Sequence, residues 1–221
     1  MSETEFGSLG EPLDRTQVRV RMAARALGRN DLGHAFGHVS ARLDADSFLV
    51  CAPKPMGLIR PDDAGTVVPV DGPLPDGVLG EVRCHQQIYK RRPDVNGIAR
   101  TFLRDVMTLS TFQRTPKPRI GFATYFAPCP PLWDDPLLLR DDAAAERFAE
   151  TLGDARAIVM RGNGCVLHFV EMVKHVTLTP DPWLWPPTCH KQFLTKRWIC
   201  VPILHCYSIF FCTAQKALIL K

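Results

Sequence analysis

The chain has 221 residues, with 27 Lys and Arg against 23 Asp and Glu, which gives a formal net charge of +4. Residues 169–221 hold six of the basic and two of the acidic residues, so the surplus lies in this segment and does not suggest nucleic-acid binding by the rest. Residues 1–16 have no apolar signal-peptide core, which predicts a cytoplasmic protein whose eight cysteines are thiols. The sequence contains no CxxC pair, so a zinc ribbon is not expected.

The first half of the chain is predicted to contain one helix and three strands. Residues 1–12 are expected to form a flexible arm, and apolar and small side chains then recur at helical spacing over residues 13–27. Asp44–Asp46 suits a hairpin turn between the first two strands. The strand patterns cover residues 36–43, 47–52 and 66–70.

Helices and strands alternate in the second half, which predicts the α/β class. Pro93 ends the first of these helices and Gly153 closes the last. Helices are expected at residues 81–91, 105–114 and 141–152, strands at residues 95–102 and 157–160, and a short extended segment at residues 122–126.

The composition changes abruptly after residue 168. Residues 169–221 contain no glycine, four of the eight cysteines and three of the four tryptophans. We interpret this segment as unrelated to the domain formed by residues 13–168, arising from a frameshift, a read-through or an unusual splice, and expect it to pack poorly. Its apolar run at residues 198–212 is too short and interrupted for a good membrane span, so no membrane partner is expected.

The stretch Gly80–His85, followed by Ile88-Tyr89 and Arg92–Val95, resembles the core of the class II aldolase/adducin family. The resemblance covers residues 13–167. It implies a class II aldolase-type layered fold, with a central, mainly antiparallel sheet flanked by helices. It also implies a homo-oligomer, provided that the C-terminal region is intact.

The same resemblance identifies the positions of a metal site. In metal-dependent members a glutamate lies beside a divalent metal, zinc in several relatives, that histidines hold. Glu81 matches the glutamate, but Arg100, Phe102 and Asn163 replace the histidines. Zinc needs at least three good donors, so the sequence predicts weak zinc binding or none. His85 lies one helical turn after Glu81 and could either share a metal with it or pack structurally.

Gly37–Arg42 resembles the family's Gly-Asn-x-Ser-x-Arg motif, which binds a carboxylate or phosphate of the substrate. The resemblance implies that Gly37, His38, Ser40 and Arg42 bind substrate, with His38 as a proton donor or hydrogen-bond partner. The alternative is an ordinary strand with alternating side chains and an exposed arginine.

Two further features bear on the substrate. Asn163 is a further candidate for substrate binding, and Leu79-Gly80 replaces the Ser-Ser pair that binds phosphate in sugar-phosphate aldolases. Tyr125–Pro128 and Pro131–Pro136 resemble the branch near the hydroxy-carboxy-muconic semialdehyde decarboxylases. A small carboxylic acid is therefore the expected substrate.

These features leave two functional hypotheses. The first is a carbon–carbon lyase, an aldolase or decarboxylase, that acts on a small keto or hydroxy carboxylic acid through an enolate. Arg100, alone or together with a divalent metal on Glu81, would then stabilise the enolate, and Glu81 would move protons. Ser40 and Arg42 would hold the substrate carboxylate. The second is a noncatalytic, adducin-like binding module or an inactive truncated paralogue.

The first hypothesis makes a geometric demand. Glu81, Arg100 and Asn163 should converge in one pocket, with Ser40 and Arg42 on its rim.

Overall fold

The computed structural model describes residues 13–119 and 121–170. The expectations for the arm and for residues 171–221 lie outside the described residues. Within them, the α/β class and the mainly antiparallel sheet are confirmed.

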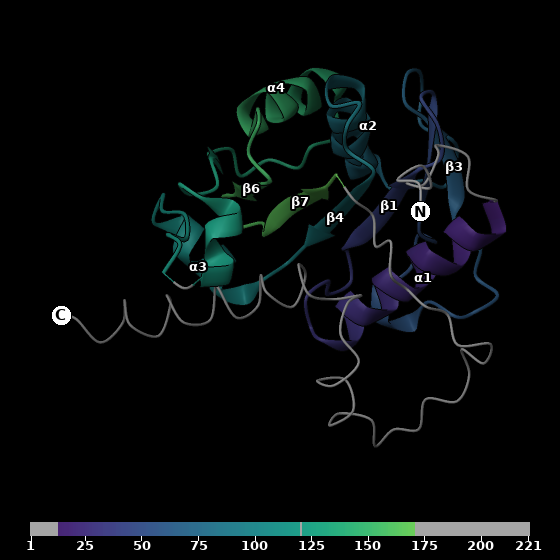
Figure 1. The fold of residues 1–221 in the computed structure, drawn as a ribbon, viewed down its shortest axis with the longest axis horizontal. Helices are drawn as coiled ribbons and strands as arrows, with labels where there is room; N and C mark the ends of the chain where they lie inside the picture. The colour runs from purple at the N-terminus through teal and green to yellow at the C-terminus, as the bar shows by residue number, and fades with distance from the viewer. Residues whose placement is uncertain (1–12, 120, 171–221) are drawn as a thin grey trace, which may run out of the picture.

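Seven strands of the described residues form one sheet, in the order β3-β2-β1-β4-β7-β6-β5 (Figure 1). Five of the six neighbouring pairs are antiparallel, and only β5 and β6 run parallel. The strands are β1 (His38–Arg42), β2 (Ser47–Val50), β3 (Thr66–Pro69), β4 (Gly97–Thr101), β5 (Leu132–Trp133), β6 (Ala157–Met160) and β7 (Cys165–Phe169). This order places β4 at the centre of the sheet.

The predicted hairpin joins β1 to β2. Asp44 fixes its turn, because Oδ1 accepts hydrogen bonds from the Asp46 N–H and the Ser47 hydroxyl, both at 2.9 Å. An aspartate that bonds the backbone two residues on stabilises such a turn without help from the rest of the fold.

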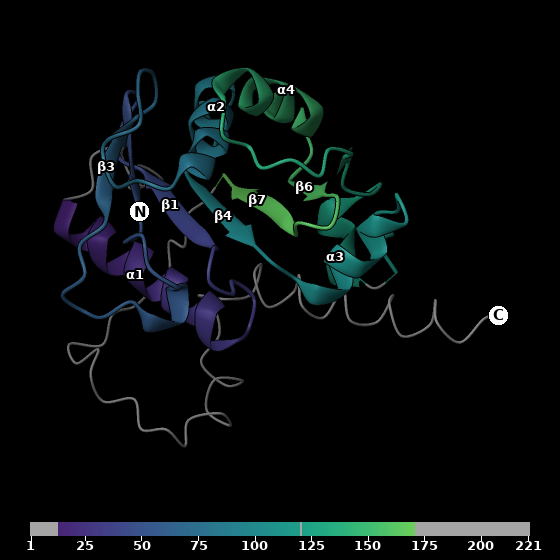
Figure 2. The ribbon, with the colours of Figure 1, turned by 180° about the vertical axis from the view of Figure 1, so that it is seen from behind.

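Within the described residues, four α-helices cover the two faces of the sheet (Figures 1 and 2). α2 and α4 pack together on one face, and α1 and α3 lie on the other. Among the described residues, no helix is long and apolar enough to cross a membrane. The helices are α1 (Leu13–Arg29), α2 (Arg83–Arg91), α3 (Arg104–Thr111) and α4 (Asp142–Leu152).

Two parts of the sequence prediction need correction. Residues 122–126 were expected to be extended, but Gly121–Phe126 forms a 3-10 helix, η3. β5 and β7 were not predicted: β5 has only two residues, and β7 runs to Phe169, across the change in composition. Its last residue pairs with Gly97 of β4, so the sheet includes the first residue of the atypical segment.

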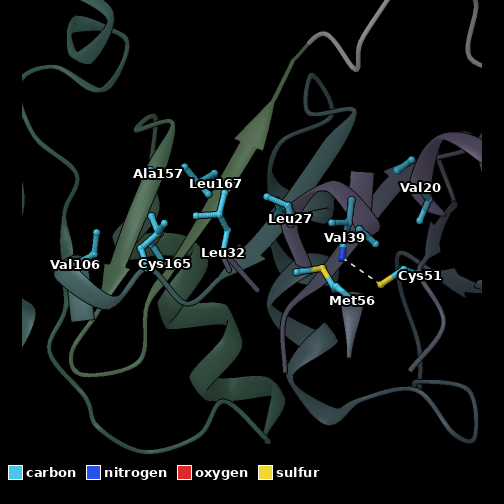
Figure 3. Packing of buried hydrophobic residues seen from close by; sticks show 14 of the residues in the cluster. Val20, Leu27, Leu32, Val39, Cys51, Met56, Val106, Ala157, Cys165 and Leu167 are labelled. Atoms are coloured by element: carbon cyan, nitrogen blue, oxygen red, sulfur yellow. Dashed lines mark hydrogen bonds between the residues drawn. The ribbon is translucent and has the colours of Figure 1, made fainter. Parts of the chain in front are cut away.

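Alternation along β1 divides its side chains between two cores. Val39 and Ala41 join the core under α1 and α3, where the Val39 N–H lies 3.4 Å from Cys51 Sγ (Figure 3). His38 and Ser40 alternate with them, so they point to the face that α2 covers. Both are buried, which places polar groups inside the core under α2.

We predict that Phe148→Ala lowers the free energy of unfolding by about 3–5 kcal/mol, because it opens a cavity under α4. Phe148 is fully buried and meets the Trp133 ring edge-on, with the ring centroids 5.7 Å apart. Urea unfolding followed by circular dichroism measures the change. Phe112→Ala is the control, since that ring is 71 % exposed; equal losses in the two variants would contradict the packing described here.

Candidate active site

Arg100 lies on the central strand with no exposed surface. Its strand neighbours are His38 on β1 and Val166 on β7. The Nη1 group donates a hydrogen bond to the Thr101 carbonyl at 3.0 Å, and the guanidinium carbon lies 4.2 Å from the centroid of the Phe102 ring. A permanent positive charge therefore sits inside the fold.

Glu81 is the carboxylate that faces this charge. It belongs to the 3-10 turn η2 (Gly80–Val82), which leads directly into α2. Its Oε2 lies 3.8 Å from Arg100 Nε, close enough for charge attraction but too far for a hydrogen bond. Burial lowers the pKa of Arg100, and the charge of Glu81 opposes that shift. Glu81 is 17 % exposed, so the pair reaches the surface through it.

Two buried histidines stand beside this ion pair. The His38 and His85 rings have centroids 4.6 Å apart. Neither nitrogen of His38, nor Nε2 of His85, has a hydrogen-bond partner. Burial lowers the pKa of His38 to about 3, helped by the charge of Arg100, and burial also lowers the pKa of His85. Both rings are therefore neutral near neutral pH.

Ser40 lies below these rings rather than on the rim of a pocket. Its Oγ is 2.7 Å from His85 Nδ1 and 2.9 Å from the Tyr89 hydroxyl, and the residue is fully buried. Burial raises the pKa of Tyr89, so its hydroxyl stays protonated. The side chains of Tyr89, Ser40 and His85 thus form a continuous hydrogen-bonded chain, and Ser40 already has two partners.

Arg42 lies at the opposite end of α2 from Glu81, which differs from the expectation that both belong to one pocket. Its Nε donates to the Val95 carbonyl at 2.8 Å, and Nη2 donates to the carbonyls of Tyr89 at 2.7 Å and Arg92 at 3.1 Å. A cation at the C-terminal end of a helix is stabilised by the unpaired carbonyls there. A substrate carboxylate would have to compete with these three acceptors.

Gly37 makes a close approach that a side chain would prevent. A Cβ at this position would lie 2.4 Å from Met56 Cε and 2.7 Å from the Gly33 carbonyl. The Gly37 N–H donates to that same carbonyl at 2.8 Å. Packing alone accounts for the glycine, so its role in substrate binding stays a prediction.

Asn163 lies in the turn between β6 and β7. Its N–H donates to the Met160 carbonyl at 2.9 Å. The turn presses on the end of β4, because a Cβ added at Gly164 would lie 2.1 Å from the Thr101 carbonyl oxygen. Asn163 is therefore near the end of the strand that carries Arg100, and its proposed contact with substrate stays a prediction.

A small pocket opens beside His38, with room for about one water molecule. Its walls are mostly apolar. The lining residues are His38, Val50, Cys51, Pro53, Thr66, Val78, Leu79 and Val82.

Tyr89 and Phe36 were not among the predicted site residues. Tyr89 follows Glu81 and His85 at the i, i+4, i+8 spacing of one helical face, which is a signal that the sequence does contain. Phe36 is 65 % exposed and lies 6.5 Å from Phe102 between ring centroids. The sequence places Phe36 in the expected strand at residues 36–43, but β1 begins at His38 and Phe36 lies in the preceding loop, so the strand pattern does not indicate this contact.

Known proteins resemble this chain in sequence and in fold. The class II aldolase and adducin N-terminal domain model matches residues 18–168. The chain belongs to this family. A 3,4-dihydroxyphthalate decarboxylase from Arthrobacter keyseri is 25 % identical to this family member over 178 residues, which is 72 % of each chain.

Solved structures of the family share the fold. The L-fuculose-1-phosphate aldolase of Thermus thermophilus superposes with a TM-score of 0.63 at 20 % identity, covering 93 % of each chain. An aldolase II superfamily protein from Pseudomonas syringae gives a TM-score of 0.60 at 23 % identity, covering 73 % of this chain and 69 % of its own.

Class II aldolases generally use a divalent metal, but the residues of this family member do not fit one. In the part of the chain that the structure describes, no group of three or more His, Cys, Asp or Glu side chains could hold a metal ion. A guanidinium faces Glu81 instead, and it can neither donate electrons to a metal nor lose its charge. We therefore derive no chemical step through a metal.

We predict that the purified full chain retains less than stoichiometric zinc after dialysis, because Arg100, Phe102 and Asn163 supply no imidazole nitrogen. Elemental analysis by mass spectrometry measures the content. Zinc at one ion per chain would refute the prediction.

We predict that the free energy of unfolding decreases as the pH falls from about 7 to about 5, because the unfolded histidines take up protons at a pKa of about 6.5 while the buried ones do not. Each such histidine contributes a slope of up to about 1.4 kcal/mol per pH unit. His38→Asn should reduce the slope by about that amount. Urea unfolding at several pH values measures it, and an unchanged slope in the variant would show that His38 is not buried in its neutral form.

Proposed function

We propose that the chain is a carbon–carbon lyase that acts on a small keto or hydroxy carboxylic acid through an enolate. The observation that supports this most is the fully buried guanidinium of Arg100 beside the partly exposed carboxylate of Glu81. A fixed positive charge in a site from which water is excluded can stabilise an oxyanion far more strongly than the same charge in water.

The chemistry assigns a different task to each of the two groups. When the carbon–carbon bond breaks, its electron pair delocalises onto the neighbouring carbonyl oxygen, and the positive charge of Arg100 stabilises the resulting enolate. In aldol cleavage, Glu81 accepts the proton of the β-hydroxyl group as the aldehyde leaves. In decarboxylation, carbon dioxide leaves without a proton transfer, and Glu81, which is partly exposed, transfers a proton from water to the enolate carbon.

The decarboxylase from Arthrobacter keyseri supports an acid as the substrate class, because its name specifies a dihydroxyphthalate. Leu79-Gly80, in place of the Ser-Ser pair, argues against a phosphorylated sugar. Leu79 instead lines the mostly apolar pocket beside His38.

A noncatalytic binding module is the second candidate. It is favoured by the contacts of Ser40 and Arg42, both of which are engaged by other parts of the fold. Such a module would bind a ligand without turnover.

We predict that Arg100→Lys lowers kcat/KM by about 10²–10³-fold, because an ammonium cannot replace the placed N–H donors of the guanidinium. The full chain is incubated with β-keto acids, β-hydroxy keto acids and 3,4-dihydroxyphthalate, and release of carbon dioxide or aldehyde is measured. The control is Arg91→Lys, since Arg91 is half exposed and pairs with Glu150 on the surface. Binding of these acids with no turnover by the unmodified chain would favour the binding module.

A further inference from the structure

One edge of the Arg100 guanidinium has no acceptor. Nη1 points to the Thr101 carbonyl, whereas Nε and Nη2, which share the other edge, have no hydrogen-bond partner. Buried donors normally have partners, because a buried unpaired donor loses the bonds that water would make. The free edge of a fully buried guanidinium therefore calls for an explanation.

Neither Glu81 nor Phe102 supplies the missing acceptor. Glu81 remains 3.8 Å from Nε, beyond hydrogen-bond distance. Phe102 packs against the flat face of the guanidinium, with 4.2 Å between the guanidinium carbon and the ring centroid. Phe102 therefore covers the flat face of the guanidinium, whereas the N–H donors of the Nε–Nη2 edge remain without an acceptor.

His38 adds unpartnered polar atoms beside this edge. It is the direct neighbour of Arg100 across the β1–β4 pair, and side chains at such positions lie about 4.5–5.5 Å apart at Cβ. Both of its ring nitrogens lack partners, although the residue is 1 % exposed. The ring also lines the small pocket that borders η2. Unpartnered atoms from two adjacent strands thus lie together inside the fold.

We infer that the Nε–Nη2 edge of Arg100 and the imidazole of His38 form a subsite for the carboxylate of a 2-oxo or dicarboxylic acid. A carboxylate presents two oxygens in one plane, which matches the two parallel N–H groups of this edge. The N–H of the neutral His38 ring then donates to the oxygen on the adjacent carbon. The inference rests on the proposed function only in taking this ligand to be the substrate.

The charges favour a carboxylate over a phosphate. Glu81 lies beside the edge, so a phosphate, with its larger negative charge, would be repelled more strongly. This subsite also differs from the expected one, since it uses neither Ser40 nor Arg42.

Oxalate and oxamate test the subsite without any need for turnover. Titration calorimetry with the full chain should give saturable binding of oxalate. Arg100→Lys should weaken the binding at least about 10-fold, because the fork is lost while the charge remains. His38→Leu should weaken it about 5–10-fold, which corresponds to one hydrogen bond. Glu81→Gln should strengthen it, because the competing carboxylate is gone.

Arg91→Lys is the control, because Arg91 is half exposed near the C-terminal end of α2 and pairs with Glu150 on the surface. It should leave the oxalate affinity within about twofold. Far-ultraviolet circular dichroism and the melting temperature verify that each variant is folded, and Glu81→Gln keeps the test informative if Arg100→Lys does not fold.

The outcomes separate this inference from the proposed function. Oxalate binding that depends on Arg100 and His38 supports the subsite even if no acid is turned over, in which case the lyase proposal alone fails. No oxalate binding, equal affinity in Arg100→Lys, or loss of affinity in Arg91→Lys overturns the subsite, whatever the activity. Tighter binding of inorganic phosphate than of oxalate overturns its assignment to a carboxylate.

Discussion

The positive charge of Arg100 is held on the central strand of the sheet, beneath α2 and away from solvent. Moving such a charge out of water costs several kcal/mol, and arginine cannot reduce that cost by losing its proton. The fold compensates this cost with few contacts. They are a hydrogen bond to one backbone carbonyl, the ring of Phe102, and the Glu81 carboxylate at 3.8 Å. A residue that the fold does not satisfy is explained most simply by a ligand that does.

The neighbouring polar groups suit a single buried charge. His38 and His85 are held neutral, so neither adds a second positive charge beside the guanidinium. The Ser40 hydroxyl connects His85 to Tyr89 and fixes the orientation of the His85 ring. Protonation of either histidine would repel Arg100, which makes the loss of stability at low pH a property of the site itself.

Arg42 supports the position of Glu81, although it lies at the other end of α2. By donating to carbonyls at the C-terminal end of α2, it fixes that end of the helix to β1. η2 continues directly into the N-terminal end of α2, so a fixed helix also fixes Glu81 relative to β4. The arginine of the motif thereby positions the site without lying in it.

Much of the fold could be predicted from local patterns. The Asp44 hairpin, α4 and β6 each have a signal within a few residues, and the structure contains all three. The two-residue β5 has no periodicity to detect, and β7 crosses into a segment of unusual composition. Residues 122–126 read as extended, yet they form 3-10 turns, because tertiary contacts override weak local preferences there.

Only part of the candidate site could be predicted from the sequence. The family motif selects Glu81 and Arg100, and the structure places them side by side. The second motif, Gly37–Arg42, selects Ser40 and Arg42. It does not indicate that the Tyr89 hydroxyl bonds to Ser40 or that Arg42 donates to backbone carbonyls. Such partners come from elements 45 to 53 residues away along the chain, beyond the reach of any local pattern.

The central claim is that Arg100 is held in the core for a ligand rather than for the fold. The most direct test is the free energy of unfolding of Arg100→Met combined with Glu81→Gln, measured by urea denaturation. If the claim is correct, this uncharged pair is as stable as the unmodified chain or about 1–4 kcal/mol more stable, because a buried charge has been replaced by an apolar side chain. A loss of more than about 2 kcal/mol would contradict the claim and assign the ion pair to the stability of the fold.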